Sequence, residues 1–429
     1  MMQPPLIHPA AVELADAART TLPNGVELYS LAADDFEVLR VTFVFRAGSA
    51  GQQAPFSASA AANLLAEGSR DMTAQQIAER LDYYGSWFDV SVDRDYAYIS
   101  FASLSRFFDA TMEVAEQLLL HPVFPEEEVR AYCAKRRQRL AIERTKVETQ
   151  AREAFAQALF GPAHPYGISS DEKEYDRLTR AQIAAFYERF YTARNCFAVC
   201  SGRVGEHELQ TVARIAAQLP AGETVPIEFP VPETQRTAFI DHPGAVQSSL
   251  RIGRLLFPRQ HPDFLGMQVV ATALGGYFGS RLMQNLRERH GYTYGAVAAM
   301  VNLERAGYFA VATQVGTDVT QAALGEIYAE IERLRREPMP AEELELVQNM
   351  MVGEMMRILD GPFGIADVTI ENILCGTDNR IIGENIRRIR AMTAREVQEL
   401  ARKYLPREEL VTVVAGDRSG YPNHRHGGA

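Results

Sequence analysis

Side chains that bind metals or act as nucleophiles are scattered in this chain. No histidine lies between His8 and His121, and no two of the seven histidines before the C-terminal end are three or four residues apart. His424 and His426 lie in the final YPNHRHGGA, which we expect to be a disordered tail. The four cysteines form no Cys-x-x-Cys motif, so we expect buried, inert thiols rather than a metal site or a disulfide.

Motifs of other enzyme classes are also missing from the sequence. There is no Gly-x-Ser-x-Gly elbow and no Walker loop, and the glycines of ALGGYFGSR (273–281) lack a nucleotide-binding context. What remains is LRERHGYTYG (286–295), in which Arg287 precedes Tyr294 by seven residues. Arginine offers a rigid fork of donors and tyrosine one O–H, but such a pair is often only the end of a helix and the start of a strand.

Composition describes a globular protein with a full core. The chain has 429 residues, 47% of them hydrophobic and 23% charged, and its net charge is −11. This acidic balance disfavours nucleic acid or an anionic membrane as a partner, since both bind basic faces. We expect no membrane span, because no window approaches about 18 consecutive apolar residues. The first 20 residues also lack the basic and apolar regions of a signal peptide.

An internal repeat indicates how the chain is organised. Thr179 with Gln182 and Thr393 with Glu396 each predict a capping box that opens a helix, and an apolar strand ending in glycine follows both. Other segments repeat at a similar spacing, among them two predicted hairpins and two helices that open with proline and glutamate. The matched segments are 178–202 with 392–416, 85–103 with 295–313, and 121–137 with 337–353.

The repeat predicts two copies of one α+β unit. Because each copy contains hairpins, we expect two mixed, largely antiparallel sheets with helices packed on them. The domains are predicted at 1–217 and 237–429, the latter ending in a tail at 418–429. A linker rich in Pro, Gly and Glu is expected at 218–236. A single large domain is the alternative.

These features together resemble the M16 (pitrilysin-type) metallopeptidases, and more narrowly their two-domain bacterial M16B subunits. The resemblance covers nearly the whole chain. It is carried by the two α+β halves, by HPYG at 164–167 and by SRLMQNLRERHGYTYG at 280–295. Active members carry the zinc motif His-x-x-Glu-His on a helix of the first half.

The zinc motif is missing at the matching position. Aligning the family's Gly-Ser turn with Gly68 places the motif on residues 59–63, where Ser59 and Asn63 replace the histidines and Ala62 replaces the glutamate. The third ligand falls near Glu143, which is either a relic or an ordinary solvated charge. The resemblance therefore implies a chain with no zinc of its own.

The second half keeps the residues that the family uses toward substrate. By resemblance, Arg287 and Tyr294 would hold a substrate carbonyl and stabilise its developing oxyanion. The implied function is a non-catalytic subunit of a heteromeric zinc peptidase. Its zinc-bearing partner subunit, a heterodimer or larger assembly with this chain, would carry His-x-x-Glu-His and cleave peptides.

Two other functions remain open from the sequence. The chain is a catalytically inert scaffold or peptide-binding subunit if Arg287 and Tyr294 are relics, or it is an enzyme with an unrelated site. By analogy with exported bacterial pairs we expect a periplasmic location, with a cytoplasmic one as the alternative. The sequence identifies neither the substrate nor its cleavage preference.

Overall fold

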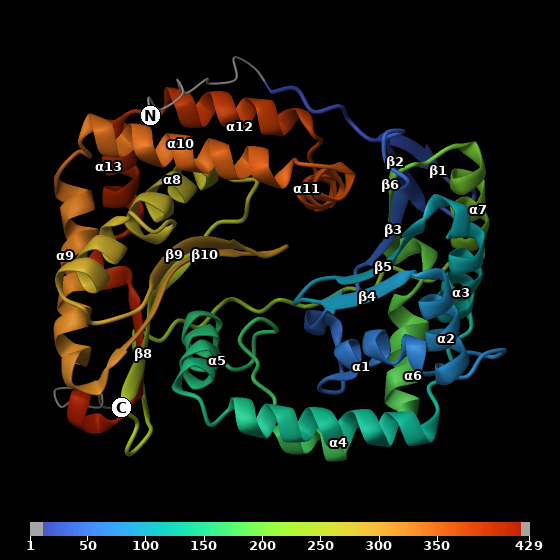
Figure 1. Ribbon diagram of the computed structural model, residues 1–429. Helices are drawn as coiled ribbons and strands as arrows, with labels where there is room; N and C mark the ends of the chain where they lie inside the picture. Colours follow the sequence, from blue (N-terminus) through green and yellow to red (C-terminus); the bar gives the residue numbers. More distant parts are fainter. Residues whose placement is uncertain (1–11, 422–429) are drawn as a thin grey trace.

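Two β-sheets, one from each half of the chain, lie on opposite sides of the protein in the computed structural model, which describes residues 12–421 (Figure 1). The first sheet has the order β1 (Ala18–Thr21), β2 (Glu27–Ala32), β6 (Cys196–Gly202), β3 (Val38–Phe45), β5 (Ala97–Leu104), β4 (Trp87–Val92). The second has the order β7 (Thr237–Asp241), β11 (Val411–Gly416), β8 (Gln247–Leu256), β10 (Gly307–Gly316), β9 (Ala296–Asn302).

The second sheet repeats the first, apart from the additional strand β1. In each sheet the last strand of the half pairs in parallel with the first strand of the repeated unit. These pairs are β6 with β2 and β11 with β7. All other neighbours are antiparallel, including the hairpins β4–β5 and β9–β10. The prediction of two mixed, largely antiparallel sheets is confirmed.

The helices follow the same repeat. The predicted capping boxes open α6 and α13, where the hydroxyls of Thr179 and Thr393 accept from the backbone N–H three residues later. The helices are α1 (Ser57–Asn63), α2 (Ala74–Tyr84), α3 (Phe108–Leu120), α4 (Glu126–Glu143), α5 (Val147–Phe160), α6 (Arg180–Phe190), α7 (Glu206–Ala217), α8 (Phe264–Gly275), α9 (Thr320–Arg336), α10 (Ala341–Ile358), α11 (Pro362–Leu374), α12 (Arg380–Ala391) and α13 (Ala394–Tyr404).

One helix of each half packs on the sheet of the other half. Helix α5 packs on β7, β8 and β11, and its Phe155 and Leu159 share a buried cluster with Val411 and Val413. Helix α11 packs on β2 and β6, where Ile370 shares a cluster with Val199. In Figure 1, α5 accordingly lies beside β8, away from the first sheet. The cores of the two halves are thus interlocked.

A buried polar junction also joins the halves. Asp95, in the β4–β5 turn, accepts the Tyr166 hydroxyl at 2.5 Å and the backbone N–H of Glu304 at 2.9 Å. Tyr96 adds a bond from its hydroxyl to the Glu304 carboxylate at 2.9 Å. Asp95, Tyr96 and Tyr166 are buried, so these bonds fix the turn of one hairpin against the turn of the other.

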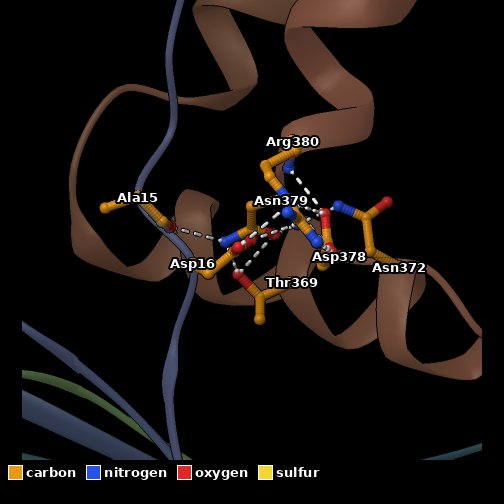
Figure 2. A network of polar contacts seen from close by, with 7 residues as sticks. All are labelled: Ala15, Asp16, Thr369, Asn372, Asp378, Asn379 and Arg380. Atoms are coloured by element: carbon orange, nitrogen blue, oxygen red, sulfur yellow. Dashed lines mark hydrogen bonds and ion pairs between the residues drawn. The ribbon is translucent and has the colours of Figure 1, made fainter.

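The N-terminal segment ties the first sheet to the far side of the second half. The side chain of buried Asn379 donates to the Ala15 carbonyl at 3.0 Å, and its backbone N–H donates to the Asp16 carboxylate at 2.9 Å (Figure 2). Thr369 and Asn372 complete the network around the Asn379 side-chain oxygen. Residues 12–17 therefore run as a strap from α12 to β1.

The predicted linker at 218–236 contains neither helix nor strand. The division into domains at this segment remains a proposal, because α5 and α11 each pack across it. Of the predicted tail, Arg418–Gly420 forms a short 3₁₀ turn. His424 and His426 lie outside the described residues.

Candidate functional site

The short helix α1 carries the three positions at which the sequence predicts a lost zinc motif. Ala62 is fully buried, while Ser59 and Asn63 are half-buried. The Ser59 hydroxyl donates to the Phe56 carbonyl at 3.0 Å, and the Asn63 amide donates to the Ser59 carbonyl at 2.7 Å. Both polar side chains are thus turned back onto their own helix. This donor set does not fit a zinc ion.

The predicted third position lies on α4. Arg139 donates to the Glu143 carboxylate at 3.0 Å, one helical turn away, so Glu143 takes part in an ordinary surface ion pair. Leu140 of the same helix, not Glu143, lines the cavity that Ser59 also lines. Among residues 12–421 no group of three or more His, Cys, Asp or Glu is placed to hold a metal ion.

That cavity, the central cavity from here on, has a volume of about 760 Å³. Both halves line it: Ser59 of α1 and Phe155 of α5 on one side, and Val297, Val301 and Tyr308 of the β9–β10 hairpin on the other. The wall is mostly apolar, and strands β8, β9 and β10 form one part of it. Strand β9 is an edge strand of its sheet. An edge strand has unpaired backbone groups that can bind an extended peptide.

Arg287 and Tyr294 line a second cavity of about 720 Å³, which we call the Arg–Tyr cavity. Arg287 lies on the π-helical segment Met283–Arg289, and its guanidinium stacks on the Phe278 ring at 4.5 Å. Segments of π-helix are rare and are frequent at functional sites. The stacking holds the guanidinium in one orientation. Its Nε lies 3.5 Å from the Glu288 carboxylate, and its two terminal nitrogens have no hydrogen-bond or ion-pair partner among residues 12–421.

Tyr294 is the most exposed large hydrophobic side chain of the described protein, at 92%. It makes no hydrogen bond to any of the residues 12–421, whereas the neighbouring Thr293 hydroxyl is bonded to the Gly295 backbone N–H at 3.1 Å. In a tyrosine the ring is usually buried and only the hydroxyl group contacts water. The exposed Tyr294 ring is thus unusual, and it lines the same cavity as the stacked Arg287.

The two cavities adjoin. Arg251, Val297 and Ala312 line both of them. The structure therefore places Arg287 and Tyr294 in one cavity and Ser59 in its neighbour, and it leaves Ala62, Asn63 and Glu143 out of both linings.

Comparison with known proteins shows which family part of the chain resembles. Residues 177–351 match the model described as the Peptidase M16 inactive domain. This segment, 175 of the 429 residues, is similar to the M16 peptidases.

Relatives and solved structures similar to this chain agree with the family match. It is 20% identical over 360 residues to the uncharacterized zinc protease YmxG of Bacillus subtilis, covering 82% of this chain and 86% of that one. It is 23% identical over 296 residues to an uncharacterized zinc protease of Rickettsia felis, covering 67% and 71%.

Two solved structures share the fold. A peptidase M16 inactive domain from Pseudomonas fluorescens aligns with a TM-score of 0.83 at 22% identity, covering 94% of this chain and 98% of that one. A protease from Helicobacter pylori aligns with a TM-score of 0.83 at 16% identity, covering 93% and 99%. The predicted fold and family are confirmed.

Other features of the protein agree with the expectations from its sequence. All four cysteines are buried and free, and burial raises the pKa of the Cys200 thiol to about 12. No helix within residues 12–421 combines the length and the apolar character needed to cross a bilayer. The sequence analysis missed Arg94, Arg152 and Arg251 of the central cavity, because they come from three distant elements and form no motif.

Proposed function

We propose that this protein is the non-catalytic subunit of a heteromeric M16 zinc peptidase. The single observation that carries the proposal is the Arg–Tyr cavity, in which a stacked Arg287 and an exposed, unbonded Tyr294 face solvent. The second support is the helix α1, whose Ser59, Ala62 and Asn63 cannot bind zinc. The partner subunit would supply the metal and the activated water.

The chemistry assigned to this chain is oxyanion stabilisation. When water attacks a peptide carbonyl, negative charge develops on the oxygen, and donors placed beforehand lower the barrier most. The Arg287 guanidinium offers charged N–H donors, and the Tyr294 hydroxyl offers one neutral donor. Because Phe278 holds the guanidinium by stacking, little side-chain freedom is lost on binding.

The experiment combines this chain with a zinc-bearing M16 protein from the same genome and follows cleavage of a quenched fluorescent peptide. We expect no cleavage by this chain alone and chelator-sensitive cleavage by the pair. Arg287→Ala or Tyr294→Phe in this chain should lower kcat by about 10² to 10³, as for loss of an oxyanion donor.

Matched controls are available outside the cavity. Arg289 is exposed on the same π-helical segment but lies outside the cavity lining, and Tyr83 is 82% exposed on α2. Arg289→Ala and Tyr83→Phe should leave kcat unchanged. A pair that assembles and cleaves equally well with all four variants would refute the catalytic role and leave a scaffold subunit.

A further inference from the structure

Three arginine side chains line the central cavity, and each comes from a different part of the fold. Arg94 lies in the turn of the β4–β5 hairpin, Arg152 on α5, and Arg251 on β8. In Figure 1 the β4–β5 hairpin extends from the first sheet toward α5 and β8, the elements that carry the other two. The interlocked halves therefore gather positive charge in a protein whose net charge is −11.

None of the three guanidinium groups forms a hydrogen bond or an ion pair within the described part of the chain. Asp95 and Glu153 attract Arg94, and Glu148 attracts Arg251, but only from beyond ion-pair distance. Asp95 is held by Tyr166 and the Glu304 backbone, and Glu153 is the one carboxylate in the cavity lining. The two glutamates also have other partners: Gln314 donates to Glu148 at 2.9 Å, and Arg144 pairs with Glu153 at 3.2 Å. The Arg251 Nε atom is buried without any acceptor.

Such a cluster is costly unless an anion joins it. Burial lowers the pKa of the Arg94 and Arg251 guanidinium groups, and the positive charge of Arg152 lowers both further. Buried donors without acceptors are rare in folded proteins because they forfeit their hydrogen bonds to water. A ligand with a carboxylate would supply the missing acceptors and the missing charge at the same time.

The register of the sheet places this charge beside the edge strand. Arg251 pairs with Ala312, and Ala312 pairs with Val297 of β9, so the three residues form one row across the sheet. Directly paired residues point to the same face of the sheet. The side chain of Ala312 is too small to cover that of Arg251 next to it in the row. Two strand spacings, about 10 Å in all, separate Arg251 from the edge.

We propose that the central cavity binds an acidic peptide, with a glutamate or aspartate carboxylate held by Arg94, Arg152 and Arg251. The peptide lies in extended form along β9, and its acidic side chain reaches across the Ala312 row. As a statement about substrate class this rests on the proposed function, but the binding itself requires only this chain. The overall acidic charge would otherwise suggest basic peptides.

The test measures binding of fluorescein-labelled decapeptides to the purified chain by anisotropy. One peptide carries glutamate at alternate positions, a second carries glutamine and a third lysine at the same positions. We expect the glutamate peptide to bind at least tenfold more tightly than the other two, with an affinity that falls as salt rises. Equal affinity for the glutamate and glutamine peptides would overturn the proposal.

Variants locate the site. Arg152→Gln and Arg251→Gln should each weaken the glutamate peptide about tenfold, whereas Arg402→Gln, an exposed position on α13, should not. Arg152 is exposed, so its variant carries the test if Arg251→Gln fails to fold. Unchanged affinity in Arg152→Gln would refute the site, as would tighter binding of inorganic polyphosphate than of the glutamate peptide.

The outcome is separable from that of the proposed function. Loss of peptide binding in Arg152→Gln, with cleavage indifferent to Tyr294→Phe, would retain the acidic-peptide site and reject the oxyanion role. The reverse pattern would retain the oxyanion role and reject the site.

Discussion

Replacing Tyr166 by phenylalanine removes one hydroxyl group from the junction between the two halves. That hydroxyl donates to the Asp95 carboxylate at 2.5 Å, and the two residues are only 2% and 6% exposed. The ring of Tyr166 also packs against Phe160 and Phe229, and phenylalanine preserves those contacts. The substitution therefore removes the bond to Asp95 and one longer bond, at 3.4 Å, that the hydroxyl accepts from the Arg305 backbone N–H.

The loss follows from the type of bond. A hydrogen bond to a charged group contributes about 1.5–3 kcal/mol, so we expect Tyr166→Phe to lower the free energy of unfolding by about 2 kcal/mol. The Asp95 carboxylate keeps its other donor, the Glu304 backbone N–H, so we do not expect a larger loss of stability. At an unfolding entropy of about 2.1 cal/mol/K per residue, the melting temperature falls by about 2 °C if all 429 residues unfold together, and by about twice that if the halves unfold separately.

The assay is equilibrium denaturation by urea, followed by circular dichroism. Tyr83→Phe, at an exposed position without a hydrogen bond, is the matched control and should change stability by less than about 0.5 kcal/mol. In a double-mutant cycle with Asp95→Asn the coupling energy should exceed about 1 kcal/mol. A loss below about 0.5 kcal/mol in Tyr166→Phe, or no coupling, would refute the view that this bond holds the halves together.

Three further predictions address the junction, the strap and the zinc-free helix. Burial raises the pKa of Asp95 above its ordinary value of 3.8, so the folded protein holds this proton more tightly than the unfolded chain. Stability relative to Asp95→Asn should then fall as pH rises above 3.8, and urea titrations showing a rise would contradict this sign. Asn379→Ala removes the side-chain bond to the Ala15 carbonyl and keeps the backbone bond to Asp16, so it should loosen the strap at residues 12–17 and cost about 2 kcal/mol. Faster limited proteolysis of the strap would show this, while the exposed Arg380→Gln should cost much less. Ala62→Glu would bury a carboxylate at a fully enclosed position and should cost roughly 3 kcal/mol or more of stability. Elemental analysis of this variant should find no bound zinc. An unchanged denaturation midpoint would show that α1 is more open than described.

Much of the fold was predictable because local sequence motifs mark the same elements in each half. The capping boxes at Thr179 and Thr393 and the two hairpins define equivalent positions in the two halves, and equivalent positions build equivalent sheets. The exchange of α5 and α11 was not predictable. An apolar helix face indicates that something covers it, but periodicity does not say which sheet does so.

The candidate site was predictable only in part. Arg287 and Tyr294 are seven residues apart, and a resemblance within one segment suffices to select them. Glu143 was placed by counting along the chain. The structure shows that Leu140, three residues earlier on the same helix, lines the cavity instead. Counting residues along the sequence cannot detect a shift of this size. The arginine cluster has no local signal, because only tertiary packing brings its members to one wall.

The exchanged helices have a consequence for how this chain could be divided. A cut within residues 218–236 would sever no helix and no strand, yet each fragment would carry a helix whose apolar face belongs against the other fragment's sheet. Each piece alone would expose Phe155 and Leu159, or Ile370, to water. Co-expressed fragments should therefore find one another and rebuild the whole, whereas either fragment made alone should aggregate.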